Sequence, residues 1–309
     1  MFAPPALAQS LRGALDWLPP GSLNLHELTQ RPQEIQAGGE RQSFFAEYGR
    51  LAFRSPDVLG GNARKAGLSC QACHPNGDAN RHFFIPGLSD RPGRIDVTHS
   101  LWSAKGDDGR ANPLEIPSLR GVKGRHRLGF DRRLGSLREF TRNVIVLEFD
   151  GAEPEPLLLD ALVAYQQTLA PGLAPGQPPS QAPGQVPEQP LRFEDDLRDF
   201  TRALGVLRLP LAEENAALTN RVTVMLRSQV GFMHERFEET APQQILEGWS
   251  QELRGIAVLA DASRWPEARD RLGALRQQAE QPPAVLMTAA PRSLYDPEKL
   301  RIWLSKPVR

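Results

Sequence analysis

The side chains with the clearest chemical potential occupy five consecutive positions, Cys70-Gln71-Ala72-Cys73-His74, which hold both cysteines of the chain. C-x-x-C-H is the attachment signature of c-type haem. Two thiols at this spacing can add across the two vinyl groups on one edge of a porphyrin, and the next residue then brings an imidazole under the iron. The pattern predicts one covalently attached haem c, held by Cys70 and Cys73, with His74 as the proximal iron ligand.

Two other chemistries use a C-x-x-C pair. A thioredoxin-like dithiol needs a strand-to-helix context, whereas Gly67-Leu68-Ser69 before the motif and Pro75-Asn76-Gly77 after it indicate loops. A zinc site needs more ligands than two thiols supply. Covalent haem is therefore the favoured interpretation, with a redox dithiol as the alternative.

The sixth iron ligand is less well defined by the sequence. Met is the usual partner in electron carriers, but residues 9–169 contain none, and Met225 and Met233 fit the core of later helices. His82 follows the motif so closely that the chain would have to turn back sharply, and His126 lies among basic residues. We expect His99, which has apolar neighbours, to be the distal ligand. A vacant or water-filled position is the alternative, and a bis-His iron would have a lower potential than a His/Met iron.

Basic residues gather between positions 110 and 133. Arg makes bidentate pairs with carboxylates, so one of them could hold a haem propionate, and Arg120 is the expected partner. The others could form a docking face for an acidic redox partner or a merely solvated cluster. The set is Arg110, Arg120, Lys123, Arg125, Arg127, Arg132 and Arg133.

The overall composition excludes several classes of protein. Lys and Arg total 37, as do Asp and Glu, so the formal net charge is zero and a general nucleic-acid binder is not expected. Two cysteines exclude a disulfide-dense scaffold. No apolar run approaches the roughly 20 residues of a membrane-spanning helix, so we expect no transmembrane segment.

The chain is expected to have two domains and a tether. Ala6-Leu7-Ala8 resembles a signal-peptidase site, so residues 1–8 are interpreted as the remnant of a signal peptide and the protein as exported, with a periplasmic location. Residues 9–169 would form the haem domain and 191–309 a helical domain. Residues 170–190, rich in Pro and Gln, are expected to form an extended linker.

Apolar periodicity places the helices. In the first segment, helices are expected around 44–51, after the capping box at Ser136–Glu139 and after Pro156. Turn-forming residues dominate 74–135, and a loop region of that length needs something to pack around. In the second segment, stripes over 193–207, 222–237, 245–256 and 265–275 predict a helical bundle. The expected fold class is mostly α: a cytochrome c-like haem domain with long loops plus a C-terminal α-helical bundle.

Beyond the motif itself, residues 40–169 resemble the cytochrome c domains of the bacterial di-haem cytochrome c peroxidase and MauG superfamily. The similar segments are Gly67–Gly77, Ile116-Pro117-Ser118-Leu119-Arg120-Gly121-Val122, Phe130–Phe140 and Leu159–Tyr165. The chain departs from that superfamily in having one C-x-x-C-H motif where its peroxidases have two. It also has Asp131-Arg132 where they have Asp-Gly before Arg. Electron relay between two haems in one chain is therefore not expected.

These observations favour a mono-haem electron carrier that exchanges electrons with a redox partner protein. Covalent haem attachment in the c-type class follows translocation, which agrees with the export prediction. A peroxidase-like enzyme is the first alternative, and it would need a labile sixth position and an acid–base group such as His99 or Glu115. A haem-based sensor, with the bundle as its output, is the second.

Overall fold

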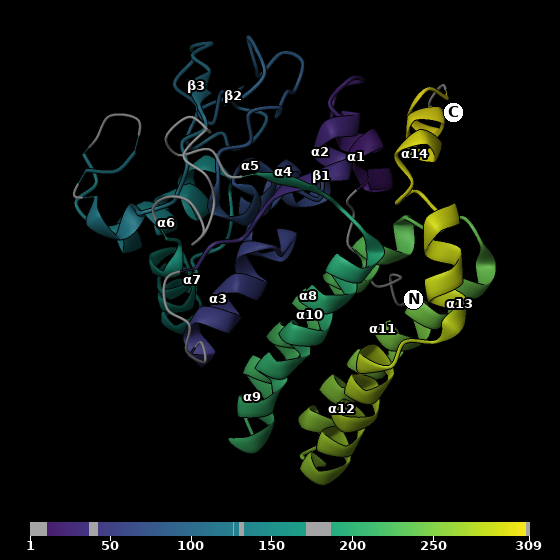
Figure 1. The fold of residues 1–309 in the computed structure, drawn as a ribbon. Helices are drawn as coiled ribbons and strands as arrows, with labels where there is room; N and C mark the ends of the chain where they lie inside the picture. The colour runs from purple at the N-terminus through teal and green to yellow at the C-terminus, as the bar shows by residue number, and fades with distance from the viewer. Residues whose placement is uncertain (1–10, 37–42, 126, 130–132, 171–186, 307–309) are drawn as a thin grey trace. The chain divides into compact units, whose positions relative to one another are not determined.

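The computed structural model describes residues 11–36, 43–125, 127–129, 133–170 and 187–306 (Figure 1). These residues are mostly helical, and the strands among them are two or three residues long. The chain divides into two compact units. Trp17–Pro190 is called the motif unit because it holds Cys70–His74, and the C-terminal unit combines Leu191–Arg309 with Met1–Asp16. Within the described ranges, no helix has the length and apolar character needed to cross a bilayer.

The motif unit is built from short elements. Its helices are α2 (Leu25–Thr29), α3 (Phe44–Phe53), α4 (Gly61–Lys65), α5 (Cys70–Cys73), α6 (Leu137–Asn143) and α7 (Pro156–Thr168). Single 3-10 turns are η1 (Pro56–Val58), η2 (Pro75–Gly77) and η3 (Val122–Gly124), and a π-helical turn is η4 (Val144–Glu148). Strand β1 (Gln30–Pro32) pairs antiparallel with β4 (Glu188–Pro190), and β2 (Arg94–Ile95) with β3 (Leu114–Glu115).

Helices α3 and α7 form the core of the motif unit, and both were expected from their apolar spacing. They cross closely at Gly49, where a Cβ atom would lie 1.8 Å from the carbonyl oxygen of Ala161. Phe53 and Tyr165 meet edge to face beside this crossing, with ring centroids 5.1 Å apart. Glycine is therefore required at position 49 for the two backbones to approach each other.

The long turn region between η2 and α6 packs around a buried tryptophan. Trp102 is 2% exposed, and its Nε1 donates a hydrogen bond to the backbone oxygen of Asp96. The Asp96 carboxylate accepts hydrogen bonds from the backbone and hydroxyl of Thr98. The described part of this loop region thus has hydrogen bonds and an apolar centre of its own.

The C-terminal unit is regular, and its helices match the predicted stripes. Its elements are α1 (Leu11–Trp17, of which Trp17 belongs to the motif unit), α8 (Phe193–Leu204), η5 (Gly205–Leu207), α9 (Arg208–Ala212), α10 (Ala216–Glu235), α11 (Thr240–Asp261), α12 (Trp265–Glu280), α13 (Ala284–Ala289), η6 (Ala290–Arg292) and α14 (Pro297–Leu304). Helices α8, α10, α11 and α12 pack on one another as a bundle. Phe200 of α8 stacks on Trp249 of α11 in its core, and Met225 and Met233 are buried, which confirms their interpretation as core residues.

The boundaries between the units differ from the expected ones at both ends. Leu11–Asp16 group with the C-terminal unit, because Leu11 is buried there and its backbone N–H donates to the Glu235 carboxylate at 2.7 Å. Glu188–Pro190, expected in the linker, form β4 on the motif unit. Residues 171–186 of the expected linker, and the expected signal-peptide remnant at residues 1–8, lie outside the described residues.

Candidate cofactor site

The C-x-x-C-H motif folds as one helical turn. Cys70 and Cys73 are the first and last residues of α5, and neither forms a disulfide. His74 follows directly, and its backbone N–H donates to the Cys70 carbonyl at 2.8 Å. The left-handed backbone of Gly67, at φ 71°, turns the chain from α4 into this segment. Both thiols and the imidazole are thus carried by a single short, hydrogen-bonded turn.

Cys70, Cys73 and His74 are half-buried, and Nδ1 of His74 is buried. Burial raises the pKa of the Cys70 thiol to about 12. Burial, and then the nearby Cys70, Glu27 and Glu148, raise the pKa of Cys73. Burial lowers the pKa of His74 to about 4, although the Pro117 backbone and Asp78 act in the opposite direction. At neutral pH the motif therefore presents two thiols and a neutral imidazole.

The three groups do not converge as the ligands of one metal ion would. A group of His, Cys, Asp or Glu side chains whose ligand atoms all lie within 4.8 Å of one another occurs once among the described residues, at His26, His82 and Glu188. Cys70, Cys73 and His74 are outside that group. Their arrangement therefore argues against a zinc site at the motif.

The chain leaving the motif is fixed by Asn76. Its backbone is left-handed, at φ 51°, as the Pro-Asn-Gly turn suggests. Its side chain accepts hydrogen bonds from Arg54 and Gln71 and donates one to the Pro32 carbonyl at 2.7 Å. The Gln71 side chain also accepts from the Asn76 backbone N–H at 3.0 Å. A residue inside the C-x-x-C segment is thereby tied to the turn that follows His74.

A buried ionic cluster lies behind this turn. The Glu34 carboxylate accepts hydrogen bonds from Arg50, Arg54 and the Tyr165 hydroxyl at 2.7–3.2 Å. Burial acts to raise the pKa of Glu34, but Arg54 and Arg50 outweigh it and lower the pKa to about 2. The cluster joins the segment after β1 to α3 and α7, and Arg54 links it to Asn76. It was missed in the sequence because its members are separated by up to 131 positions.

The segment Ile116–Gly121 lies against the motif. The backbone N–H of Leu119 donates to the Gly77 carbonyl at 2.9 Å. The Pro117 backbone acts to raise the pKa of the His74 ring. Nδ1 of that ring is nevertheless buried without a hydrogen-bond partner of normal geometry. Metal-binding histidines commonly use a backbone carbonyl to orient the ring. Pro117 is the residue of this segment best placed for that task.

Arg120, the predicted propionate partner, is 7% exposed. Its guanidinium donates to the Gln33 carbonyl at 2.7 Å and lies 3.7 Å from the Asp78 carboxylate. Its Nε and one terminal nitrogen are buried without hydrogen-bond partners. Burial lowers the pKa of Arg120, while Asp78 opposes that change. Buried donors without acceptors are costly, so this side chain can accept an additional anionic partner.

Two carboxyl groups near Cys73 were not predicted. Burial raises the pKa of Glu27 to about 7, although hydrogen bonds from Asn80 and Asn24 act to lower it. Burial alone raises the pKa of Glu148 to about 7. Glu148 closes the π-helical turn η4, and such turns are frequent at functional sites. The available sequence signal was a single carboxylate within the apolar run Val144–Phe149.

The remaining predicted site residues lie in different surroundings. Nδ1 of His99 accepts a hydrogen bond from the Leu101 backbone at 3.0 Å, within its own turn. Glu115, proposed as an acid–base group, is an exposed residue of β3 paired with Arg91. His82 stacks on His26, and His126 lies outside the described residues. His99 remains a prediction for the sixth ligand, whereas the exposure of Glu115 does not suit an acid–base role at a buried centre.

Arg120 differs from most of the basic cluster in being buried. Arg110, Lys123, Arg125, Arg127 and Arg133 are exposed, and Arg132 lies outside the described residues. The exposed members can act on charges in solution, whereas Arg120 acts inside the unit.

No known protein family, curated protein sequence or solved structure matches the chain.

Proposed function

We propose that the protein is an exported c-type cytochrome that carries one haem in the motif unit and acts in electron transfer. The observation that carries the proposal is the Cys70–His74 turn, in which two free thiols and a neutral imidazole share one helical turn. The motif unit would then be a cytochrome c-like domain with long loops. When bound, the haem iron would supply a one-electron carrier.

The chain's own groups fit such a cofactor. Cys70 and Cys73 would each form a thioether, and His74 would ligate iron as the neutral imidazole that burial maintains. The Pro117 backbone would orient that ring. Nη1 of Arg120, which is buried without a hydrogen-bond partner, would donate to a propionate.

Covalent attachment is the first test. The full chain, preceded by a cleavable export signal, is produced in bacteria with an active cytochrome c maturation system. The periplasmic fraction is then analysed by haem staining of a denaturing gel, intact mass and the Soret band. We expect one haem per chain, and none in the Cys70→Ser/Cys73→Ser double variant. His99→Ala is the matched control, because it leaves both thiols in place and should keep the covalent haem. A mature chain that carries no porphyrin mass would refute the proposal.

The sixth ligand is tested on the same preparations. If His99 ligates the iron, the native protein gives a low-spin spectrum, and His99→Ala converts it to high spin or to another ligand set. A low-spin spectrum that is unaltered in His99→Ala would exclude His99 as the ligand. A native high-spin ferric spectrum would indicate the vacant or water-filled alternative.

The peroxidase-like function is the second candidate, and Glu148 is the observation that favours it. A carboxyl group with a pKa of about 7, close enough to Cys73 to raise the pKa of that thiol, can hold or release a proton at neutral pH. Peroxide-dependent oxidation of a one-electron donor that falls strongly in Glu148→Gln would support an enzyme. A six-coordinate low-spin spectrum that is unchanged by peroxide or carbon monoxide would favour the electron carrier.

Electron transfer requires a partner protein. The exposed basic residues between 110 and 133 offer a surface that would speed association with an acidic partner through long-range attraction. The rate of reduction by an acidic donor protein should then fall steeply as salt is added, and Arg127→Glu should slow it at low salt. A rate independent of salt would argue against docking at this surface.

A further inference from the structure

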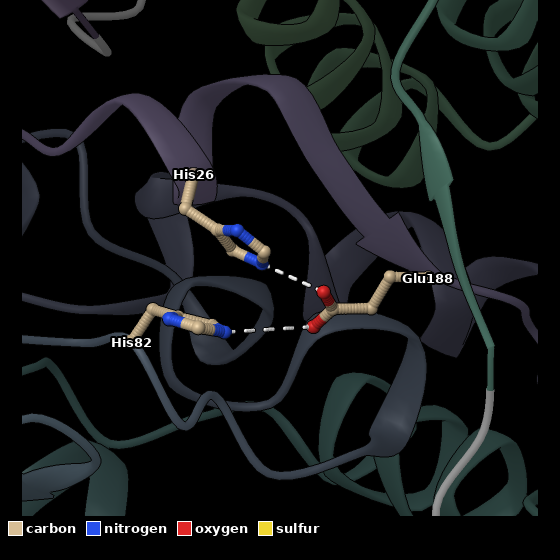
Figure 2. Close-up of side chains that lie close together, drawn as sticks. All are labelled: His26, His82 and Glu188. Carbon is tan, nitrogen blue, oxygen red and sulfur yellow. Dashed lines mark hydrogen bonds and ion pairs between the residues drawn. The ribbon is translucent and has the colours of Figure 1, made fainter.

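Three potential metal ligands converge on the surface of the motif unit, apart from the C-x-x-C-H turn. They come from three segments: His26 from α2, His82 from the loop after η2, and Glu188 from β4. Nε2 of His26 lies 2.6 Å from one carboxylate oxygen of Glu188, and Nε2 of His82 lies 4.0 Å from the other. Figure 2 shows both rings turned toward the same carboxylate.

Hydrogen bonds outside the cluster hold the three residues in place. At the start of α2, the Asn24 side chain accepts a hydrogen bond from the Glu27 backbone N–H and donates one to the His82 carbonyl at 3.1 Å. Asn24 therefore links the segment that carries His26 to the segment that carries His82. The His82 backbone N–H donates to Asn80 at 3.1 Å. Glu188 is fixed by the β1–β4 pairing, in which it lies opposite Pro32. Asn24, Asn80 and the strand pairing thus hold the segments that carry the cluster.

The two imidazoles are close enough to disfavour a double positive charge. Their ring centroids are 3.6 Å apart and the planes are inclined by 32°. Burial and the neighbouring His26 lower the pKa of His82, although Glu188 acts to raise it. Neutral imidazole is the form that binds metal ions. The lowered pKa of His82 therefore favours the neutral, metal-binding form of that ring.

We propose that His26, His82 and Glu188 form a Zn²⁺ site on the motif unit. Two imidazole nitrogens with one carboxylate are a common ligand set for zinc, and three protein ligands leave a fourth position for water. This proposal does not depend on haem attachment, because none of the three residues belongs to the motif.

The distances suit an ion after small side-chain adjustments. Zinc bonds of about 2.0–2.2 Å in a tetrahedron place neighbouring ligand atoms about 3.3 Å apart. The two nitrogen-to-oxygen distances, 2.6 and 4.0 Å, lie on either side of that value. The side chains are 38%, 44% and 39% exposed, so an ion can enter from solvent and the rings have room to turn.

The bound ion would have a structural effect. Glu188 begins β4, the last element of the motif unit before the chain enters the C-terminal unit at Leu191. Zinc would join this strand to α2 and to the loop that follows the cofactor motif. It would thereby reinforce a ladder of only three residue pairs.

The test measures Zn²⁺ bound to the full chain by equilibrium dialysis near neutral pH, with any free thiols alkylated beforehand. Blocking the thiols makes the result independent of whether haem is attached. We expect one Zn²⁺ per chain, and an affinity at least about tenfold lower in His26→Ala, His82→Ala and Glu188→Gln. His234→Ala is the matched control, because His234 forms a His–Glu pair with Glu247 at 3.2 Å but lies outside the three-residue group.

Hydrogen exchange provides the second measurement. Zn²⁺ should slow exchange in peptides covering 25–32 and 187–190 of the native chain, but not of His82→Ala. A native chain that retains no Zn²⁺, or His82→Ala with undiminished affinity, would overturn the proposal and leave an ordinary His–Glu ion pair. The haem content of the same variants is recorded in parallel, so failure of the zinc site is distinguishable from failure of haem attachment.

Discussion

Removing the charge of Glu34 should be the most damaging single-atom change in the motif unit. Glu34→Gln keeps the size of the side chain but leaves Arg50 and Arg54 without their shared carboxylate. Both guanidinium groups are under 10% exposed, at 4% and 7%. Breaking a buried ion pair by removing one partner costs roughly 3–5 kcal/mol, and we expect a loss of that order at pH 7.

The pKa of Glu34 gives an independent magnitude. Its decrease from 4.5 to about 2 corresponds to about 3.5 kcal/mol of stability, at about 1.4 kcal/mol for each pKa unit. Because the pKa is lower in the folded state, this contribution is fully present above pH 4.5. It is lost as the pH falls toward 2 and the carboxylate is protonated.

The assay must report on the motif unit, because Glu34, Arg50 and Arg54 all belong to it. Hydrogen exchange of α3 and α7 amides, corrected for intrinsic rates at each pH, gives the free energy of opening of that unit. The free energy of opening of the native protein should fall between pH 4.5 and 2.5. That of Glu34→Gln should already be low at pH 7 and should change less with pH. Glu153→Gln, which removes a solvent-exposed partner of Arg142, should change nothing measurable. Equal opening energies for the native protein and Glu34→Gln at pH 7 would refute the reasoning.

Four further changes test other parts of the fold. Gly49→Ala should cost at least about 3 kcal/mol in hydrogen exchange of α3, because its methyl group would overlap the Ala161 carbonyl. Gly273→Ala, with nothing within 4 Å of the added carbon, should instead stabilise α12 by about 0.5–1 kcal/mol. Glu148→Gln should stabilise the motif unit by about 2–3 kcal/mol above pH 7 and by little below pH 4.5. The reason is that a raised pKa makes the folded carboxyl bind a proton more tightly than the unfolded one. Phe200→Ala should cost roughly 3–5 kcal/mol in urea unfolding of the bundle, because the ring is fully buried against Trp249. Smaller changes in stability would contradict the packing from which these values are estimated. An effect of Glu148→Gln that does not depend on pH would contradict the raised pKa of Glu148.

Local patterns in the sequence predicted the elements that local physics determines. The bundle helices follow from apolar stripes, and Ser136 caps α6 by accepting from the Glu139 backbone at 3.1 Å, as the capping box predicts. After the capping box the sequence also indicates an apolar stripe of Leu137, Phe140, Val144 and Leu147. This stripe is wrong at its last member, because the π-helical turn changes the helical phase. Leu147 is 39% exposed, whereas Ile145 is buried. An apolar run does not reveal where such a turn occurs.

Apolar periodicity does not predict contacts between residues that are far apart in the chain. The motif at Cys70–His74 can be recognised in the sequence because its reactive residues lie within five consecutive positions. The Glu34 cluster and the His26, His82 and Glu188 group are assembled from segments far apart in the chain. Glu188 was assigned to the linker because of the composition of that segment. Nothing in the sequence Glu188-Gln189-Pro190 indicates that it pairs with β1.

The chain passes from one unit to the other at two places, Asp16–Trp17 and Pro190–Leu191, so both units contain residues from each side of positions 171–186. Residues before position 171 supply Leu11–Asp16 to the C-terminal unit, where Leu11 bonds Glu235. Residues after position 186 supply β4 to the motif unit. A protease cut between 171 and 186 therefore yields two fragments that each contribute to both units. The fragments should elute together under native conditions and separate only in denaturant.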